Sequence, residues 1–477
     1  MRKILLMTAV AIGLTFSTGC DQGFEELNTN PNDPTTVPSG LLIADVVFNA
    51  GNTLYSTFVG GDMGSCWAQH WGKVQYNDEE RYVPRENVIE NLIWKVYYED
   101  VISDARTMQL IAETEENKNV QGVGLVMQAY GYSVLTDMFG DIPFTDTIKA
   151  SEGNFTPAYD RQEVVYNGIL AMLDQADELL SADGGTINAS SDILYGGDWS
   201  KWEKFANSLK FRCLMRISGK RDVSNDLKDL VANRSMFASR ADEAKLVYLG
   251  ADPSANPLYE TIVFGNRGEH KLNEKLVNML AELNDPRLPV YAQPNAAGEY
   301  RGKPAGIEDV PNDDYNYENV SAVGLYYLQP TTPAYFVSYS ELLFLMAEAA
   351  QRGLISGSAA DYYNMGIAAS FEANGLSANQ AATYTAQGTV VYSASKGLQQ
   401  IAEQNWLGLF CQGVEAWTEW RRTGYPALQP AIEGLISEIP SRYTYPTIEQ
   451  SVNKTAYEAA VAAQGPNLLT TKIWWDN

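Results

Sequence analysis

The sequence predicts a mostly α-helical protein in which helices pack as antiparallel pairs and one long insert is rich in loops. Two observations lead to this fold class. Several long stretches place apolar residues three and four positions apart, the spacing that puts them on one face of a helix. In residues 251–333 this spacing breaks down, and Pro, Gly, Asn, Asp and Tyr dominate.

The first two helix pairs are expected before the insert. Residues 88–112 and 120–138 have helical spacing and are joined by a short polar segment, so they should form one antiparallel pair. Residues 160–180 carry apolar side chains along one face, and residues 199–217 are the expected partner. We therefore expect a second pair directly after the first.

The clearest pair follows the insert. Residues 341–352 are apolar almost all round, Gly353 ends this helix, and residues 359–373 place small and apolar residues at helical spacing. Alanines at the helix contact and the adjacent Tyr362 and Tyr363 are typical of a degenerate tetratricopeptide repeat. The sequence thus predicts a tetratricopeptide-like helix-pair scaffold.

The insert, residues 251–333, is too long to be a plain connection, and only residues 272–283 have helical spacing. Long loops on a rigid scaffold often carry binding residues, so a binding surface is expected here. A final helix at residues 396–410, running toward residue 422, precedes a Pro-rich tail.

The first residues have the layout of an export signal that ends in a lipid attachment site. Arg2 and Lys3 precede an apolar run at residues 4–16, and small residues then lead to Cys20. That run would reach only about 20 Å as a helix, against about 30 Å for a bilayer core. We expect residues 1–19 to be cleaved and Cys20 to be lipidated, although Ser17 stands where such sites usually have Leu.

Residues 28–34 combine Asn, Asp and Pro at a density that favours turns. We therefore expect residues 20–40 to form a lipidated tether and residues 41–477 to form a single domain that contains the insert. Beyond Cys20 no apolar run approaches the roughly 18 residues of a spanning helix. The membrane would hold this protein through its lipid anchor only.

Charge and composition exclude several classes of function. The chain has 34 basic and 59 acidic residues and a net charge of −25; without Arg2 and Lys3, 32 basic residues remain and the net charge is −27. Such a surface repels phosphate backbones, so nucleic-acid binding is not expected. Only two histidines occur, and GxSxG, GxxxxGK[ST] and GxGxxG are absent. We expect no cofactor, no metal site and no enzyme activity.

Three cysteines remain after Cys20, and none lies in a CxxC pair. An odd number of well-separated cysteines argues against a disulfide framework in an exported protein. We expect Cys66, Cys213 and Cys411 to be buried as small apolar side chains.

Five segments resemble the SusD/RagB-like outer-membrane lipoproteins of Bacteroidetes, in particular the SusD-like branch. They occur in the family's order and span nearly the whole mature chain. They are ELNTNPN at 26–32, FGDIP at 139–143, WEKFANSLK at 202–210, EAWTEWRRTGYP at 415–426 and IWWD at 473–476.

The resemblance implies a lipid-anchored protein on the outer face of the outer membrane that closes over a SusC-like TonB-dependent transporter. Such proteins hand the transporter a glycan or, in some members, a peptide, and do no chemistry on it. The implied fold has four tetratricopeptide-like pairs and a loop-rich face for the nutrient. Asp21, Glu25 and Glu26 fit the family's surface-export pattern.

Glycan sites need aromatic side chains that stack on sugar rings, with polar groups beside them. Residues 66–83 form the densest candidate, with polar residues between the aromatic ones. The ligand-binding candidates there are Trp67, His70, Trp71, Tyr76 and Arg81. If the segment is helical, Trp67 and Trp71 share a face, and that face could instead pack on the core.

The second candidate lies in the insert, where Tyr315, Tyr317 and Tyr326 stand among turn residues. Tyrosines in such loops are rigid, amphipathic contact residues, although they could also cover the underside of their own loop. Asp314, Asn316 and Glu318 alternate like calcium ligands, but Asn319 stands where such a loop needs glycine. Trp417, Trp420, Arg421 and Arg422 are expected to be structural, with arginine covering tryptophan at a helix end.

Three further readings stay open at this stage. The ligand could be an oligopeptide bound in the same groove, the chain could be a helical-repeat scaffold without a ligand, or two of its many carboxylates could form a glycosidase pair. Nothing in the sequence marks any pair of carboxylates as catalytic. Nutrient binding for a transporter is the function that the sequence favours.

Overall fold

The computed structural model describes residues 37–147, 153–308 and 314–476. The described chain is mostly helical, as predicted, and from Ser39 onward it forms one compact unit whose three sheets have two short antiparallel strands each. The predicted signal peptide, Cys20 and the tether up to residue 36 lie outside the described residues. Within the described ranges, no helix is long and apolar enough to cross a membrane.

The first predicted pair is present, with one irregular member. Its first helix runs without a break from residue 86 to residue 114 and is π-helical over two stretches. Its parts are α4 (Glu86–Val88), η3 (Ile89–Trp94), η4 (Tyr97–Ser103) and α5 (Asp104–Thr114). The partner is α6 (Lys118–Phe139). A Cβ at Gly131 of α6 would lie 2.7 Å from Ile102 Cγ1, so glycine allows this close approach.

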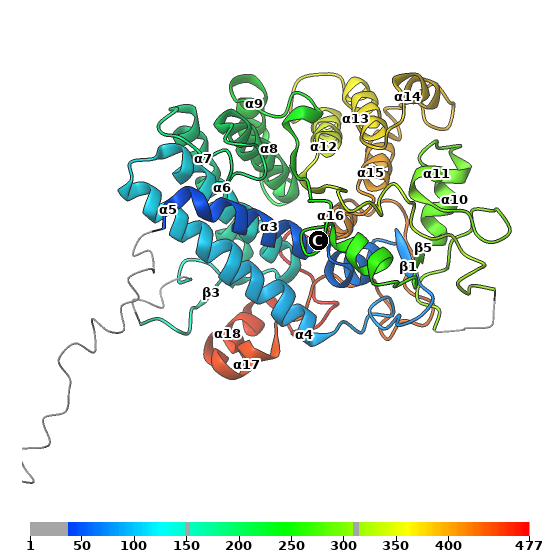
Figure 1. The fold of residues 1–477 in the computed structure, drawn as a ribbon, viewed down its shortest axis with the longest axis horizontal. Helices are drawn as coiled ribbons and strands as arrows, with labels where there is room; N and C mark the ends of the chain where they lie inside the picture. The colour runs from blue at the N-terminus through cyan, green and yellow to red at the C-terminus, as the bar shows by residue number, and fades with distance from the viewer. Residues whose placement is uncertain (1–36, 148–152, 309–313, 477) are drawn as a thin grey trace, which may run out of the picture. The chain divides into compact units, whose positions relative to one another are not determined.

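The second pair is also present and shares α6 with the first. Helix α7 (Gln162–Ser181) packs on both α6 and α8 (Trp199–Ile217), and α9 (Ser224–Asn233) follows. The expected separate pairs therefore form one continuous array, in which α3 (Leu42–Tyr55) packs on α5 and α6 (Figure 1). Because neighbours cover α6 on several sides, 19 of its 22 residues are buried.

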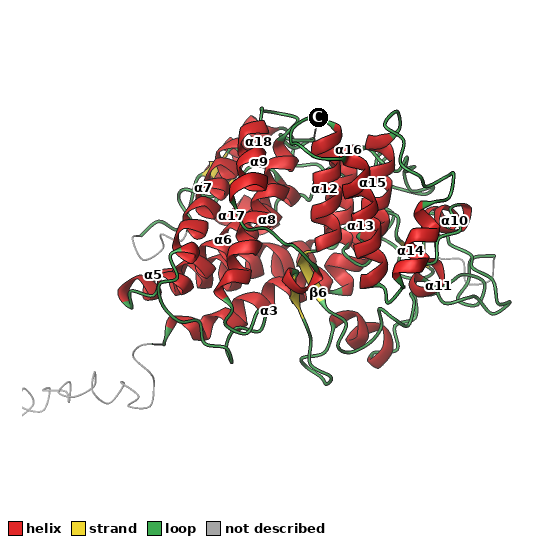
Figure 2. Cartoon of the chain, turned by 90° about the horizontal axis from the view of Figure 1, so that it is seen from above, coloured by secondary structure: helices red, strands yellow, loops and turns green. Residues whose placement is uncertain are grey.

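The third predicted pair follows the insert and is part of a second helix array. Helix α12 (Tyr339–Gln351) begins at Ser338, whose side chain accepts a hydrogen bond from the Glu341 amide. It packs on α13 (Ala359–Ala373) and α15 (Gly397–Gly408), and the three helices lie side by side in Figure 2. Helices α14 (Ala378–Thr385) and α16 (Gly413–Thr423) complete this part. The predicted tetratricopeptide-like pair is α12 and α13.

The insert contains more regular structure than its sequence suggests. The expected helix at 272–283 is α10 (Glu274–Glu282), but two further short helices were not predicted: η7 (Tyr259–Phe264) and α11 (Leu288–Tyr291). At four and six residues they are too short to show helical periodicity.

The remaining elements are short. Strand β1 pairs with β5, β2 with β3, and β4 with β6. Their bounds are β1 (Trp71–Lys73), β2 (Ile142–Pro143), β3 (Tyr159–Asp160), β4 (Ala244–Leu246), β5 (His270–Leu272) and β6 (Ala334–Val337). The other helical segments are η1 (Ser39–Leu41), η2 (Thr57–Ser65), η6 (Arg240–Asp242), α17 (Thr447–Val452) and α18 (Lys454–Gln464). Cys66, Cys213 and Cys411 are buried free thiols, as predicted.

Candidate functional site

Three of the predicted ligand-binding residues are core residues in this structure. Trp67 and Trp71 are each 1% exposed and His70 is fully buried. The Trp67 indole donates to the Glu79 carbonyl at 2.8 Å, and His70 Nε2 lies 3.0 Å from the Trp406 carbonyl oxygen. Burial lowers the pKa of His70 to about 3, so its imidazole is neutral. Side chains enclosed in this way offer no ring face to a ligand, which corrects their assignment.

The helical face considered for Trp67 and Trp71 does not form. The chain turns at Gln69, where φ is +56°, and then enters strand β1, in which Trp71 lies opposite Leu272 of β5. The two tryptophans therefore pack against different neighbours. Trp67 meets Trp417 edge-on at 5.1 Å, and Trp71 meets His270 at 5.6 Å.

The end of the same segment is exposed and meets the insert. Tyr76 is 57% exposed and Tyr317 is 45% exposed. The Tyr317 hydroxyl donates to Gln75 Oε1 at 2.8 Å, and its ring lies close to Gly268, where an added Cβ would be 3.8 Å away. Strand pairing between β1 and β5 brings these parts together, because Val74 donates to the Glu269 carbonyl at 3.0 Å.

Each of three tyrosines in this region carries a cation against its ring. The distances to the ring centroid are 5.4 Å for Arg267 over Tyr76, 5.6 Å for Lys271 over Tyr317 and 4.8 Å for Arg301 over Tyr315. We call these six residues the tyrosine platform. Lys271 also donates to the Tyr317 carbonyl at 3.0 Å, and Arg301 donates to the Asp314 carbonyl at 2.9 Å. The cations thereby hold both the rings and the backbone of the loop.

Buried ion pairs connect the strands that carry the platform to η2. Asp62 of η2 contacts Lys73 Nζ at 3.0 Å, His270 Nε2 at 2.9 Å and Arg85 Nη2 at 2.8 Å. Burial opposes ionisation of Asp62, but the hydrogen bond and charge of His270 and the charge of Lys73 outweigh it, so the pKa of Asp62 lies below its usual value. The two strands β1 and β5 are therefore tied to η2.

A second buried pair joins the segment to the insert. Lys303 Nζ lies 3.1 Å from Glu80 Oε2, and Glu80 also accepts hydrogen bonds from the Lys73 and Gly306 amides at 2.9 and 2.8 Å. Because both residues are 1% exposed, these contacts are shielded from water. The platform thus rests on a rigid base, which lowers the entropy lost when a ligand binds.

The predicted ligand residue Arg81 makes protein contacts on the same segment. Its guanidinium lies 3.0 Å from Glu308 and donates to the Glu433 carbonyl at 3.0 Å. Its side chain is 18% exposed. Arg81 therefore joins the segment to the insert and to the C-terminal part of the chain.

The last predicted residue, Tyr326, lies in a separate concave region of about 280 Å³, which we call the tyrosine hollow. Tyr55, Tyr326, Tyr327 and Tyr335 line it, together with residues of β4 and the ends of α13 and α15. The rings of Tyr326 and Tyr327 meet at 67° with centroids 5.5 Å apart. The structure thus brings Tyr76, Tyr315 and Tyr317 together and places Tyr326 in another cavity.

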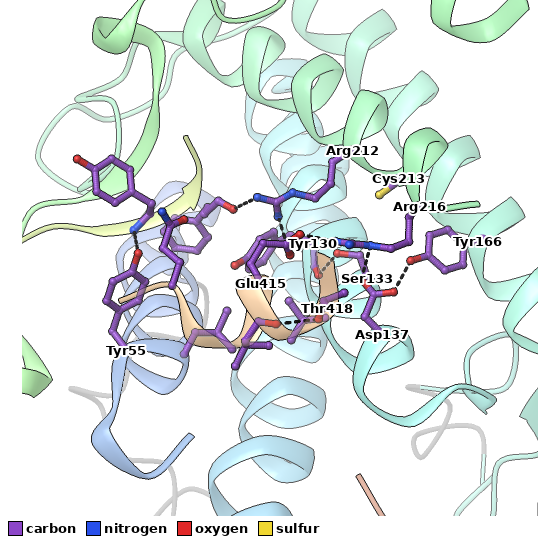
Figure 3. Close-up of a pocket in the computed structure, with 16 residues that line it drawn as sticks. Tyr55, Tyr130, Ser133, Asp137, Tyr166, Arg212, Cys213, Arg216, Glu415 and Thr418 are labelled. Carbon is purple, nitrogen blue, oxygen red and sulfur yellow. Dashed lines mark hydrogen bonds and ion pairs between the residues drawn. The ribbon is translucent and has the colours of Figure 1, made fainter. Parts of the chain in front are cut away.

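An interior ion network joins α8 to α6, α12 and α16. Arg212 binds Glu341 through two nitrogens at 2.5 and 2.6 Å. Arg216 Nε lies 3.2 Å from Asp137, and a second nitrogen of Arg216 donates to Glu415 (Figure 3). The third nitrogen donates to Glu419. The cavity beside them measures about 40 Å³, which is room for a water molecule but not for a sugar ring.

The tryptophan and arginine of the fourth family-like segment belong to the same interior. The guanidinium carbon of Arg421 lies 3.6 Å from the Trp417 ring centroid, and Arg421 donates to the carbonyls of Ser441 and Asp137 at 2.8 Å. Burial lowers the pKa of Arg421 to about 10, so it stays charged at neutral pH. These residues hold helix ends together, as predicted.

No group of three or more His, Cys, Asp or Glu side chains suited to a metal ion occurs within the described ranges. The platform cations were not predicted from the sequence. Arg267, Lys271 and Arg301 meet their tyrosines over sequence separations that range from 14 residues to 191, and no local pattern signals such contacts.

The sequence model of a SusD-like family described as "starch-binding associating with outer membrane" matches residues 31–446. The chain belongs to this family. Proteins of the SusD-like family are binding proteins rather than enzymes and are associated with the outer membrane. A comparison with curated protein sequences gives no match.

Solved structures agree with this assignment. A chitin-binding protein shares 28% identity at a TM-score of 0.82 over 92% of this chain and 100% of that one. A SusD homologue from Bacteroides fragilis shares 26% identity at 0.80 over 93% and 100%. An outer-membrane protein of Bacteroides vulgatus, described as involved in nutrient binding, shares 28% identity at 0.81 over 93% and 100%.

Proposed function

We propose that this protein binds a glycan on the tyrosine platform and passes it to a SusC-like TonB-dependent transporter. The platform carries the proposal, because it presents two exposed tyrosines on a buried ionic base. Lipidation at Cys20 would hold the protein on the outer face of the outer membrane. Residues 1–19 and 20–40 would serve as signal peptide and tether.

The chemistry of the platform suits sugars. A pyranose ring presents a flat C–H face to an aromatic ring, and its hydroxyls need hydrogen-bond partners nearby. Tyr76 and Tyr317 supply the rings, while Gln75, Arg267 and Arg301 supply polar groups. The family description names starch and one similar structure is of a chitin-binding protein, which makes oligosaccharides of glucose and N-acetylglucosamine the first ligands to test.

Calorimetry on the soluble chain beginning after Cys20 tests the glycan proposal. Maltoheptaose, chitohexaose and a panel of other oligosaccharides are titrated against the wild type and the double variant Tyr76→Ala/Tyr317→Ala. Two stacking contacts of about 0.5–1.5 kcal/mol each predict an affinity lower by roughly 5- to 150-fold in the variant.

The matched control is Phe155→Ala, which removes a 75% exposed aromatic ring outside the platform and should leave binding unchanged. An oligopeptide panel runs in parallel, since the exposed Asp314 and Glu318 beside the platform could meet basic side chains. Binding of peptides and of no glycan would overturn the glycan proposal.

Delivery is tested in cells. Cys20→Ala should release a folded protein that still binds its glycan but no longer supports uptake. The wild-type protein should co-purify with a TonB-dependent barrel. Uptake that is unchanged by Cys20→Ala would contradict the role of the anchor.

A further inference from the structure

We propose that the tyrosine hollow is a second binding site and that it takes a sugar unit bearing a carboxylate, of the uronic acid class. This goes beyond glycan binding on the platform, since it concerns another cavity with a different charge. It follows from three properties of the hollow: its shape, the fixed positions of its tyrosines and the charge of its lining.

The hollow has the dimensions of a site for a small ring. Its volume of about 280 Å³ lies just below the usual range for drug-sized ligands, so it suits one or two sugar rings. Tyr326 is 48% exposed and stands at 67° to Tyr327. Two aromatic rings at this angle form a corner into which one ring of a ligand can stack.

The walls of the hollow are already ordered. The Tyr326 hydroxyl donates to the Ala373 carbonyl at 2.7 Å, and the Tyr327 hydroxyl donates to Asn374 Oδ1 at 2.6 Å. The Tyr55 hydroxyl accepts from the Tyr335 amide at 2.8 Å. These bonds fix the rings before a ligand arrives, and side chains that are already fixed lose little entropy on binding.

Polar groups that suit sugar hydroxyls converge on the same space. Five such side chains line the hollow: Thr332, Ser338, Ser340, Asn374 and Gln412. They offer both donors and acceptors. A mainly aromatic cavity with a few polar groups is the usual composition of a small-molecule site.

The charge of the lining is unusual for this chain. Arg240 and Lys245 line the hollow, while none of its described lining residues is Asp or Glu, although the chain has 59 acidic and 34 basic residues. Both cations share the buried carboxylate of Glu243, at 3.5 Å from Arg240 and 3.2 Å from Lys245. The two cations therefore line the hollow, while the carboxylates that pair with them, Glu243 and Glu372, stand outside its lining.

Arg240 is loosely held by its partners. Its carboxylate contacts are 3.4 Å to Glu372, which is 69% exposed, and 3.5 Å to Glu243. The contact to Glu243 comes from Nε and is too long for an ordinary hydrogen bond, and Arg240 also hydrogen-bonds the Tyr335 side chain. Arg212, by contrast, makes two bonds of 2.5 and 2.6 Å to Glu341.

A carboxylate in the hollow could approach Arg240 more closely than the two carboxylates that now contact it at 3.4 and 3.5 Å. Guanidinium binds carboxylate through parallel, charge-assisted hydrogen bonds, and Lys245 would add a second positive charge. The sugar ring would stack against Tyr326. A sugar ring that carries a carboxylate in place of its terminal hydroxymethyl group is a uronic acid.

Calorimetry with glucuronate, galacturonate, glucose and N-acetylglucosamine on the mature chain tests this assignment. We expect a uronate to bind at least about tenfold more tightly than glucose, with a preference that shrinks at high salt. Arg240→Gln should reduce uronate affinity about tenfold or more, and Tyr326→Ala should reduce binding of the ring. The control Arg234→Gln replaces a 43% exposed arginine outside the hollow and should leave uronate affinity unchanged.

Circular dichroism checks that each variant folds, and Lys245→Met replaces Arg240→Gln if the latter does not. Equal affinity for glucose and uronate, or uronate binding unaffected by Arg240→Gln and Lys245→Met, would overturn the proposal. Binding of a sugar sulfate in preference to both uronates would overturn the carboxylate assignment.

The platform variant Tyr76→Ala/Tyr317→Ala separates this proposal from the previous one. It should keep uronate binding at one equivalent while its glycan affinity falls as stated above. Loss of uronate binding in that variant would mean that the hollow is not an independent site. Uronate binding that persists without any glycan binding would instead refute only the platform proposal.

Discussion

The tyrosine platform and the interior ion network use the same kinds of residue for different ends. In both, an arginine lies against an aromatic ring, at 5.4 Å for Arg267 over Tyr76 and at 3.6 Å for Arg421 over Trp417. The network is enclosed and surrounded by carboxylates, whereas the platform exposes its rings. Residue type therefore says little about role. Burial makes the ion network structural, while exposure allows the platform to contact a ligand.

Two residues of one segment, five positions apart, show the same contrast. Trp71 is 1% exposed between η2 and β5, while Tyr76 is 57% exposed. A Cβ at Gly61 would lie only 2.9 Å from the Trp71 ring, so the indole fits tightly against η2. Trp71 supports the platform from inside, and Tyr76 forms its surface.

The largest expected effect comes from the centre of the ion network. Arg216→Met leaves Asp137, Glu415 and Glu419 without their shared cation in a buried site, which should cost about 3–5 kcal/mol of unfolding free energy. Urea unfolding measures it. The control Lys454→Met removes an exposed pair with Glu458 and should change stability by less than about 0.5 kcal/mol. Equal losses of unfolding free energy in Arg216→Met and Lys454→Met would contradict the distinction between the buried network and surface ion pairs.

Trp71→Ala should have an effect of similar or slightly smaller size. Truncating a fully buried indole typically costs about 3–5 kcal/mol, because a cavity remains beside η2. The same unfolding experiment measures it. If Trp71→Ala left stability unchanged and abolished glycan binding directly, the assignment of Trp71 to the core would be wrong.

Burial of His70 should make the unfolding free energy depend on pH, with an effect of intermediate size. Its folded pKa of about 3 lies below the unfolded value near 6.5, so the unfolded state takes up the proton first as the pH falls. Stability contributed by neutral His70 is present above pH 6.5 and decreases below it, by about 2 kcal/mol at pH 5. His70→Gln should flatten this part of the pH profile of unfolding. An unchanged profile would contradict the burial of a neutral imidazole.

The smallest effect on stability is expected at the platform. Tyr76→Ala should change unfolding free energy by less than about 0.5 kcal/mol, since the ring is more than half exposed. It should still lower glycan affinity several-fold, measured by calorimetry. A large loss of stability without a change in glycan affinity would show that Tyr76 has a structural role and does not bind the ligand.

The sequence by itself determined the helical scaffold and the family. Apolar periodicity placed α8 and α13 at their observed bounds, because helix formation depends on residues three and four positions apart. It also gave Tyr315, Tyr317 and Tyr326 of the insert as ligand-binding candidates, and Tyr317 and Tyr326 are exposed in the structure. It failed within residues 66–83, where alternating polar and aromatic residues concealed a turn at Gln69 and a buried strand.

Only the tertiary structure decided which aromatic side chains face solvent and which cations accompany them. Lys271 meets Tyr317 across 46 residues, and Tyr326 of the insert meets Ala373 of α13 across 47. Such contacts depend on strand pairing and helix packing between distant segments, and no local pattern encodes them. The residues that form the tyrosine platform and the tyrosine hollow are therefore brought together only in the folded chain.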